Sequence, residues 1–377
     1  MPDPNLIPDY KGKCITKIPD TVKSLLIGDH KNTLLKGKSE KVLLVVIDSL
    51  GYQNLMKISG EEDEVKKSIE LFDLDKITTV FPPSTVPGIT SLITGKTPEK
   101  HSLLGWVTYS REMNMRFYPL RSEPVEEDRK QEFEGKYVGK GTGRESLFAD
   151  LSEEGVRVCS VNPEGITDSK NSKERGVHEE GYSNLVEAFV KIRKLITEEN
   201  RSFFYLYLPF FDHSQHENGP YSEESRALIR EIFHLMEEEL IHRLEDLEII
   251  VTADHGCVEE EKRIEIRKEN ELGKEIFPNL ETQHGEKILP AGEPRNLYLH
   301  IEDEKIEQVI ENLREILKGE AKIIRTDELI DENLFGSRAP SRSFQDNIGD
   351  VTILPEKTRQ FISTRIWRKK IKECTEA

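Results

Sequence analysis

The feature that most constrains the fold of this chain is a series of short, continuous apolar runs separated by amphipathic segments. The first run, Lys41–Ile47, is rich in β-branched residues and is bounded by polar ones. A run that is apolar at every position suits a strand covered on both faces, as in a parallel sheet. Similar runs recur at Val156–Val161, Phe203–Leu208, Leu247–Thr252, Asn296–His300 and Val351–Leu354.

Helical patterns lie between these runs. The segment Ser222–Leu247 begins with acidic residues and then repeats apolar side chains at helical spacing. The segment Ser183–Glu198 begins at a serine that we expect to be the N-cap, and Lys305–Leu317 forms a third pattern. Strands that alternate with helices predict an α/β fold with a mostly parallel central sheet sandwiched by helices.

Several stretches fall outside this alternation. Residues 1–40 have weak periodicity, and we expect them to be a lead-in segment that packs on the core. Long insertions lie near 109–145 and 258–283, and 325–347 has no clear period. Insertions of this kind in α/β enzymes often form lids or substrate loops at strand ends, and plain solvated excursions are the alternative.

The charge of the chain excludes some classes of function. Its 377 residues carry 54 Lys and Arg against 71 Asp and Glu, a net charge of −17. That balance disfavours a protein that coats a nucleic acid polymer or binds an anionic membrane surface. The four cysteines form no CxxC pair, and no signal-peptide pattern is visible, so we expect a cytoplasmic protein. The sequence carries no signal for an oligomeric state.

Aspartate and histidine residues follow the predicted strands at the point where each strand ends. These residues are Asp48, Asp212 with His216, Asp254 with His255, and His284 just before a later strand. The carboxyl ends of parallel strands meet at one edge of the sheet, where carboxylates this close would repel one another without a cation. Oxygen and imidazole ligands together suit zinc or manganese. A helix cap is the alternative for any single Asp, and His213 could compete as a ligand.

A second signal lies in the segment 78–95, TTVFPPSTVPGITSLITG. It predicts a strand, a proline-rich bend and then an apolar helix that begins near Ser84 or Thr85. The free N–H groups at a helix start favour an anion, and a hydroxyl held there beside a metal can act as a nucleophile. A plain N-cap is the alternative, because Ser and Thr are preferred caps.

These blocks together resemble the alkaline phosphatase superfamily, and more closely the prokaryotic branch of its type I phosphodiesterase/nucleotide pyrophosphatase family. The matching blocks, in order, are VVID ending at Asp48, TVFPPSTVPGITSLITGKTPEKH around Thr85, PFFDHSQHENGP around Asp212, ADHG around Asp254 and QHG around His284. The resemblance runs from about 41 to 300, with a further strand near 348–355. It implies an alkaline phosphatase-like catalytic domain over 41–377.

The resemblance also implies a site with two divalent metal ions, zinc or else manganese. Carried over to this chain, Asp212, His216 and His284 would hold one ion. Asp48, Asp254 and His255 would hold the other, with the Thr85 hydroxyl between them as a ligand and as the nucleophile. The reaction implied is hydrolysis of a small phosphodiester or nucleotide through a phosphothreonine-type intermediate.

One position departs from the animal members of the family. They carry an Asn shortly after the His-Gly segment, where Trp106 stands in this sequence. We expect Trp106 to contact substrate, through its N–H or by stacking on a base, with core packing as the alternative. A C–P hydrolase similar to phosphonoacetate hydrolase and a non-catalytic binding module on the same fold are the alternative functions. For the predicted phosphodiesterase, the expected partner is a small-molecule phosphate ester.

Overall fold

The computed structural model describes residues 7–28, 33–136, 145–167, 177–337, 339–356 and 358–362. The chain forms two compact units, each made from two separate stretches of sequence. Unit 1 comprises Met1–Thr97 and Gly141–Val258, and unit 2 comprises Pro98–Lys140 and Glu259–Ala377. The expected division into a lead-in over 1–40 and one catalytic domain over 41–377 stays a prediction.

Unit 1 contains the parallel sheet that the apolar runs predict. Its strands, in spatial order, are β6 (His178–Tyr182), β5 (Arg157–Pro163), β7 (Ser202–Leu208), β1 (Lys41–Ile47) and β8 (Leu247–Thr252). All neighbouring pairs are parallel, and β1 lies between β7 and β8. The predicted α/β fold with a mostly parallel central sheet is confirmed.

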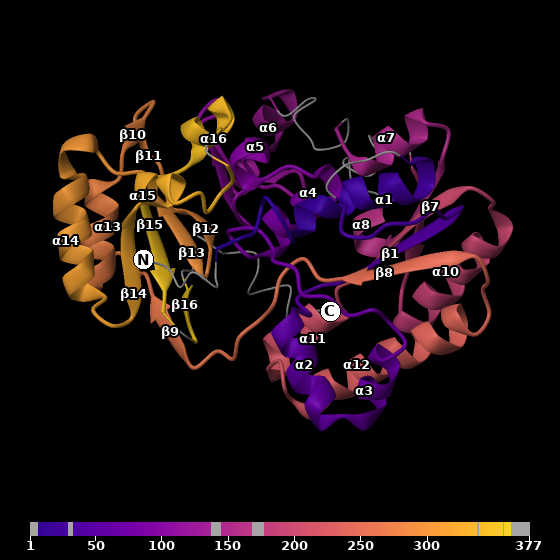
Figure 1. Ribbon diagram of the computed structural model, residues 1–377. Helices are drawn as coiled ribbons and strands as arrows, with labels where there is room; N and C mark the ends of the chain where they lie inside the picture. Colours follow the sequence, from indigo (N-terminus) through magenta and orange to yellow (C-terminus); the bar gives the residue numbers. More distant parts are fainter. Residues whose placement is uncertain are drawn as a thin grey trace. The chain divides into compact units, whose positions relative to one another are not determined.

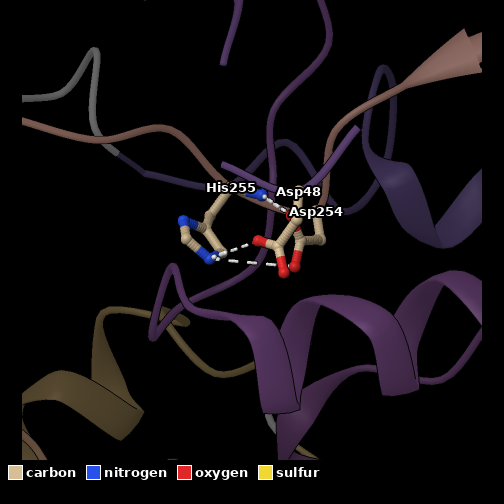
Figure 2. Close-up of side chains that lie close together, drawn as sticks. All are labelled: Asp48, Asp254 and His255. Carbon is tan, nitrogen blue, oxygen red and sulfur yellow. Dashed lines mark hydrogen bonds and ion pairs between the residues drawn. The ribbon is translucent and has the colours of Figure 1, made fainter. Parts of the chain in front are cut away.

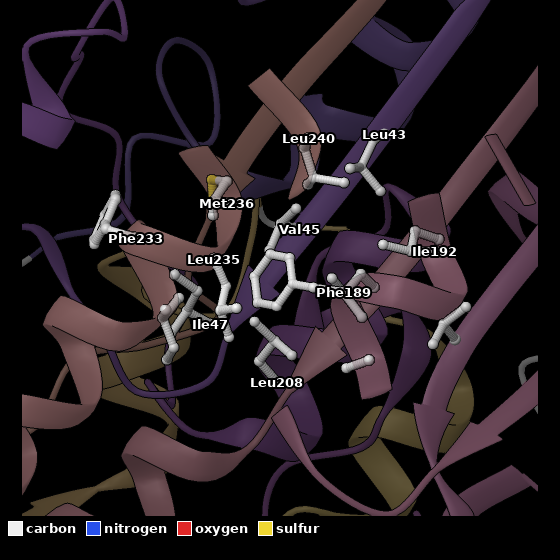
Figure 3. Packing of buried hydrophobic residues seen from close by; sticks show 14 of the residues in the cluster. Leu43, Val45, Ile47, Phe189, Ile192, Leu208, Phe233, Leu235, Met236 and Leu240 are labelled. Atoms are coloured by element: carbon white, nitrogen blue, oxygen red, sulfur yellow. The ribbon is translucent and has the colours of Figure 1, made fainter. Parts of the chain in front are cut away.

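Helices cover both faces of this sheet (Figure 1). They are α1 (Ile18–Ile27), α2 (Tyr52–Glu61), α3 (Asp63–Ile69), α4 (Thr85–Thr94), α7 (Leu147–Glu153), α8 (Glu164–Thr167), α10 (Leu185–Glu198), α11 (Phe210–Asn218) and α12 (Glu223–Met236). Alternate residues of β1 point to opposite faces. Val42, Leu44 and Val46 pack with α1, α4 and α7. The intervening Leu43, Val45 and Ile47 pack with α10 and α12, as Figure 3 shows around Phe189.

Two helix ends differ from the prediction. The N-cap of α10 is Asn184 rather than Ser183, because the Asn184 side chain accepts a hydrogen bond from the Glu187 N–H. Ser183 instead donates to the Glu187 carboxylate through both its N–H and its hydroxyl. The α12 helix ends at Met236 and continues only as a π-helical turn over Glu237–Ile241, well before the predicted end at Leu247.

Unit 2 contains a four-stranded sheet with antiparallel neighbours. Its strands, in spatial order, are β12 (Ala291–Glu293), β13 (Asn296–Leu299), β15 (Val351–Pro355) and β14 (Ala321–Arg325). The runs predicted at Asn296–His300 and Val351–Leu354 therefore belong to this second sheet. β13, α14 (Ile306–Ile316) and β14 form a strand–helix–strand unit, and β15 inserts between its strands.

The insertions contain secondary structure of their own. Within the first lie β2 (Thr108–Ser110), β3 (Met115–Tyr118), β4 (Glu123–Pro124) and α6 (Lys130–Lys136), which precede residues 137–144, outside the described part. The second includes β9 (Lys262–Glu265), α13 (Glu271–Asn279) and β10 (Thr282–Gln283). The remaining elements of unit 2 are α5 (Pro98–His101), β11 (Glu286–Lys287), α15 (Thr326–Asp331), α16 (Arg342–Asn347) and β16 (Arg359–Ile362). Across the described ranges, no helix has the length and apolarity needed to cross a membrane.

Candidate active site

The carboxyl ends of β1 and β8 bring three of the predicted metal ligands together. Asp48 directly follows β1, and its N–H donates to the Leu208 carbonyl oxygen, so the ladder with β7 extends one residue past the strand. Asp254 and His255 follow β8, which pairs with β1 on its other side. Figure 2 shows the three side chains converging. One ligand atom from each lies within 4.8 Å of the others.

The cluster is buried and tightly spaced. His255 Nε2 lies 3.3 Å from Asp48 Oδ1 and 3.7 Å from Asp254 Oδ2. The side chains of Asp48 and Asp254 are 3% and 0% exposed, and that of His255 is 10% exposed. Among the described residues, His255 is the only side chain that forms an ion pair with either carboxylate. Two buried carboxylates facing one imidazole leave an excess of negative charge at this edge of the sheet.

Thr85 joins this cluster from the start of α4. Ser84 is the N-cap residue of that helix but makes no capping hydrogen bond through its side chain. Thr85 is the first helical residue, and its Oγ1 lies 3.1 Å from His255 Nε2. The hydroxyl of Thr85 therefore faces the carboxylate cluster instead of capping the helix. The free N–H groups at the start of α4 favour an anion at the same place.

The electrostatics of the cluster follow from its burial and its charge. Burial, with repulsion from Asp254 and then Asp212, raises the pKa of Asp48 to about 8. Burial by itself lowers the pKa of His255, but the carboxylates of Asp254, Asp48 and Asp212 outweigh it and hold that pKa well above its ordinary value. Both shifts show that this edge of the sheet favours added positive charge.

Hydrogen bonds orient the ligand side chains. The Nδ1–H group of His255 donates to the Gly256 carbonyl oxygen at 2.8 Å, which leaves Nε2 directed toward the carboxylates. The Tyr207 hydroxyl donates to Asp48 Oδ2. Asp254 Oδ1 accepts from the N–H groups of Ser49 and His255 at 3.1 and 3.0 Å. Such partners fix the tautomer and the direction of a metal-ligating side chain.

Close backbone packing places Thr85 beside Asp254. A Cβ added at Gly88 in α4 would lie 2.7 Å from the Asp254 carbonyl oxygen and 3.0 Å from the Asp254 Cβ. The Thr79 hydroxyl, which precedes α4, donates to the same carbonyl. Only a residue without a side chain lets α4 approach the loop after β8 this closely.

Asp212 and His216 lie one turn apart on α11, which follows β7. Asp212 Oδ1 is 3.4 Å from His216 Nε2 and accepts a hydrogen bond from Gln215 at 3.1 Å. The charge of Asp212 is felt at both Asp48 and His255. His216 is 45% exposed. His213, the competing candidate, lies 3.6 Å from Glu217 and is also exposed.

The other two predicted site residues belong to unit 2. His284 is exposed at the tip of the hairpin formed by β10 and β11, where His284 and Gly285 both have positive φ, as a type I′ turn requires. Trp106 is half-buried, donates its backbone N–H to Glu293 and stacks under the Arg121 guanidinium at 5.4 Å. Their assignment as metal ligand and substrate contact stays a prediction from the sequence.

The cluster in unit 1 fits a divalent metal ion. Asp48 Oδ1 and Asp254 Oδ2 are buried atoms without a hydrogen-bond partner in the described part of the chain. A buried carboxylate oxygen in that state is costly unless a cation or donor satisfies it. One imidazole nitrogen and carboxylate oxygens form a donor set that zinc and manganese accept.

Comparison with known proteins gives the family of the chain. Residues 42–376 match the family model described as type I phosphodiesterase/nucleotide pyrophosphatase. The chain belongs to this family. Family members are hydrolases that act on phosphodiester and pyrophosphate bonds, and they normally bind divalent metals. The resemblance to this family stated from the sequence blocks is thereby confirmed, and the prokaryotic branch stays a prediction. No curated protein sequence gave a match.

Solved structures of relatives share the fold at low sequence identity. An inactive form of murine ectonucleotide pyrophosphatase/phosphodiesterase 5 in complex with AMP is 16% identical, with a TM-score of 0.61 over 85% of this chain and 80% of that one. The human protein is 19% identical, with a TM-score of 0.60 over 86% of this chain and 81% of that one. At this identity the likeness establishes the α/β architecture of the family.

Proposed function

We propose that this protein is a metal-dependent phosphodiesterase or nucleotide pyrophosphatase that hydrolyses a small nucleotide or phosphodiester. The observation that carries the proposal is the Thr85 hydroxyl, which faces His255 Nε2 at 3.1 Å beside two buried carboxylates. Family membership supports the bond type, and the AMP bound to the murine relative makes nucleotides the first substrate class to test.

We assign the metal ligands from the same geometry. Asp48, Asp254 and His255 would hold one divalent ion, with Thr85 beside it. Asp212 and His216 would contribute to a second ion, together with His284 as the sequence resemblance implies. Zinc is the first candidate and manganese the second. A divalent ion bound here lowers the pKa of a neighbouring hydroxyl and neutralises charge on phosphoryl oxygens.

The residues of the chain then divide the reaction into two steps. Thr85 Oγ1 loses its proton to solvent and attacks phosphorus in line. A bond forms between Oγ1 and phosphorus as the bond to the leaving-group oxygen breaks, and the leaving group departs with that electron pair. The N–H groups at the start of α4 receive the phosphoryl oxygens. Water then attacks phosphorus, the Oγ1–phosphorus bond breaks, and Thr85 regains a proton.

A substrate comparison tests the proposal. Purified protein would be assayed with bis-p-nitrophenyl phosphate, p-nitrophenyl phosphate and p-nitrophenyl thymidine monophosphate, with zinc or manganese added. We expect the diesters to be hydrolysed faster than the monoester. The change Thr85→Ala should lower diester turnover by at least about a thousandfold, because it removes the nucleophile.

Matched controls separate this outcome from its alternatives. Ser84→Ala removes the neighbouring hydroxyl and should leave most of the activity. Treatment with a chelator should abolish turnover, and added zinc should restore it. Turnover that survives both Thr85→Ala and chelation would contradict the proposal. Hydrolysis of phosphonoacetate in preference to every diester would favour the C–P hydrolase instead.

A further inference from the structure

A second cluster of potential ligands lies within unit 2. It consists of Glu281, His300 and Asp350, whose ligand atoms lie within 4.8 Å of one another. None of the three belongs to the five short motif blocks listed for the family resemblance, and none of them is used in the proposed reaction.

The register of the sheet places these residues side by side. Leu299 pairs with Val351 in the antiparallel ladder of β13 and β15, so the next level of that ladder sets His300 beside Asp350. On the other side, Leu280 forms an antiparallel bridge with Ile301, and the Glu281 N–H donates to the His300 carbonyl oxygen at 2.8 Å. Residues opposite each other on adjacent strands project to the same face. His300 therefore lies between two carboxylates on neighbouring segments.

The surroundings of the His300 side chain point to a bound ligand. It is only 1% exposed, and neither ring nitrogen has a hydrogen-bond partner within the described residues. Burial and then Arg111 outweigh the opposing effects of Glu281 and the nearby Asn347 backbone and lower the pKa of His300 to about 4, so the ring is neutral at pH 7. A neutral imidazole is the form that binds metals. Buried imidazole nitrogens normally have hydrogen-bond partners, so two without one are unusual.

The charged groups around His300 favour a bound cation. Arg111 pairs with both oxygens of Glu281, at 2.7 and 2.8 Å, and its Nε donates to the Asp346 carbonyl oxygen. This fork uses one lone pair on each Glu281 oxygen, and each oxygen has a second. Asp350 Oδ2 accepts from the Ile301 N–H at 2.9 Å, and its carboxylate receives no ion pair from a described residue. Two carboxylates against one guanidinium leave a net negative charge.

We propose that Glu281, His300 and Asp350 form a separate binding site for a divalent transition-metal ion, with zinc as the first candidate. One imidazole nitrogen and two carboxylates are a zinc-type donor set. The ion would connect the ends of β13 and β15 to the segment before β10, and would stabilise unit 2. This proposal does not depend on the proposed function, because no residue of the unit 1 cluster takes part.

Zinc titration calorimetry in a background that lacks the ligands of the proposed active site tests this cluster. The triple change Asp254→Asn, His255→Ala and His216→Ala would remove ligands of both proposed active-site ions, and zinc chloride alone would be the probe. We expect this background to retain a binding event. Adding His300→Phe or Asp350→Asn should weaken it by at least about tenfold, because each removes a ligand. Asp346→Asn, which changes a neighbouring carboxylate outside the cluster, should leave it unchanged.

Melting temperatures distinguish a ligand from a structural histidine. The phenyl ring of His300→Phe keeps the edge-on contact with Tyr109, whose ring centroid lies 5.0 Å away, and removes two unpartnered polar atoms. We expect the metal-free variant to melt at or above the background temperature, while zinc raises the melting temperature of the background alone. Zinc binding that is absent from the background, or equal in the background and in both ligand variants, would overturn the proposal.

Discussion

The Tyr207 hydroxyl donates a hydrogen bond to Asp48 Oδ2 at the buried end of the parallel sheet. Tyr207 lies on β7 and Asp48 directly follows β1, so the bond joins the two central strands beside Thr85. It directs the other oxygen of Asp48 toward His255. Tyr207 is therefore a positioning residue for the Asp48 carboxylate.

Removing that hydroxyl tests this role. We expect Tyr207→Phe to lower metal affinity and diester turnover by roughly tenfold to a hundredfold, which is typical for the loss of a partner that orients a metal ligand. Excess zinc should restore part of the turnover. Tyr182→Phe, which removes a hydroxyl that donates to a backbone carbonyl of β7, is the control and should retain metal affinity. Equal losses in both variants would argue for a general packing effect.

The approach of α4 to Asp254 gives a second prediction. Gly88→Ala should place a methyl group against the Asp254 carbonyl oxygen and displace either α4 or the loop. We expect a loss of about 1–3 kcal/mol in stability, as for other overpacked sites, and a clear loss of turnover. Gly60→Ala in α2 is the matched control, because a Cβ there meets nothing within 4 Å. It should stabilise the protein by about 0.5–1 kcal/mol. Denaturant unfolding measures both changes.

The stability of metal-free protein should fall as pH rises. Folded Asp48 has a pKa of about 8 against an ordinary 3.8, so the folded state keeps a proton that the unfolded state loses between those values. His255, with its raised pKa, acts in the same direction above its ordinary 6.5. The free energy of unfolding therefore decreases with pH across this window. In a chelator, we expect the melting temperature to drop by several degrees from pH 5 to 8.

Two comparisons check the origin of that slope. Asp48→Asn should flatten it, because the amide does not titrate. Added zinc should reverse it, since metal binding requires the deprotonated ligands. A wild-type slope that Asp48→Asn leaves unchanged would assign the effect to other groups.

The cap of α10 gives a prediction about stability alone. Asn184→Ala should destabilise the protein by about 1 kcal/mol, because it removes the hydrogen bond to the Glu187 N–H. Ser183→Ala keeps that cap and should cost less. Thermal unfolding of both variants measures the difference. A larger loss of stability in Ser183→Ala than in Asn184→Ala would identify Ser183 as the cap.

The sequence predicted the parallel sheet well because its strands are buried on both faces. Lys41–Ile47 and Leu247–Thr252 form strands with the predicted bounds. The similar runs near 296 and 351 predict the same kind of strand, yet they pair antiparallel in unit 2. Apolar patterns report burial, and they do not report which strands become neighbours. Strand direction therefore needed the structure.

The two sites also differ in how far the sequence predicts them. Asp48, Asp254 and Thr85 were predictable because each stands at the end of a strand or the start of a helix. The sequence does not predict the role of Tyr207, because this residue lies inside an apolar run. Its hydroxyl near the end of the strand is the one signal of a polar partner. The cluster of Glu281, His300 and Asp350 comes from three segments with no shared motif. Only the ladder register brings those segments together.

The division of unit 1 into two stretches has a consequence for synthesis of the chain. Among the described residues of the first stretch, β1 is the only strand, and both of its neighbours in the sheet belong to the second stretch. A nascent chain that has passed Thr97 holds Asp48 and Thr85 but cannot close the sheet until β8 emerges. At bacterial or eukaryotic elongation rates that interval is roughly 10 to 30 s. We therefore expect the apolar β1 strand to be a target for chaperones on the ribosome.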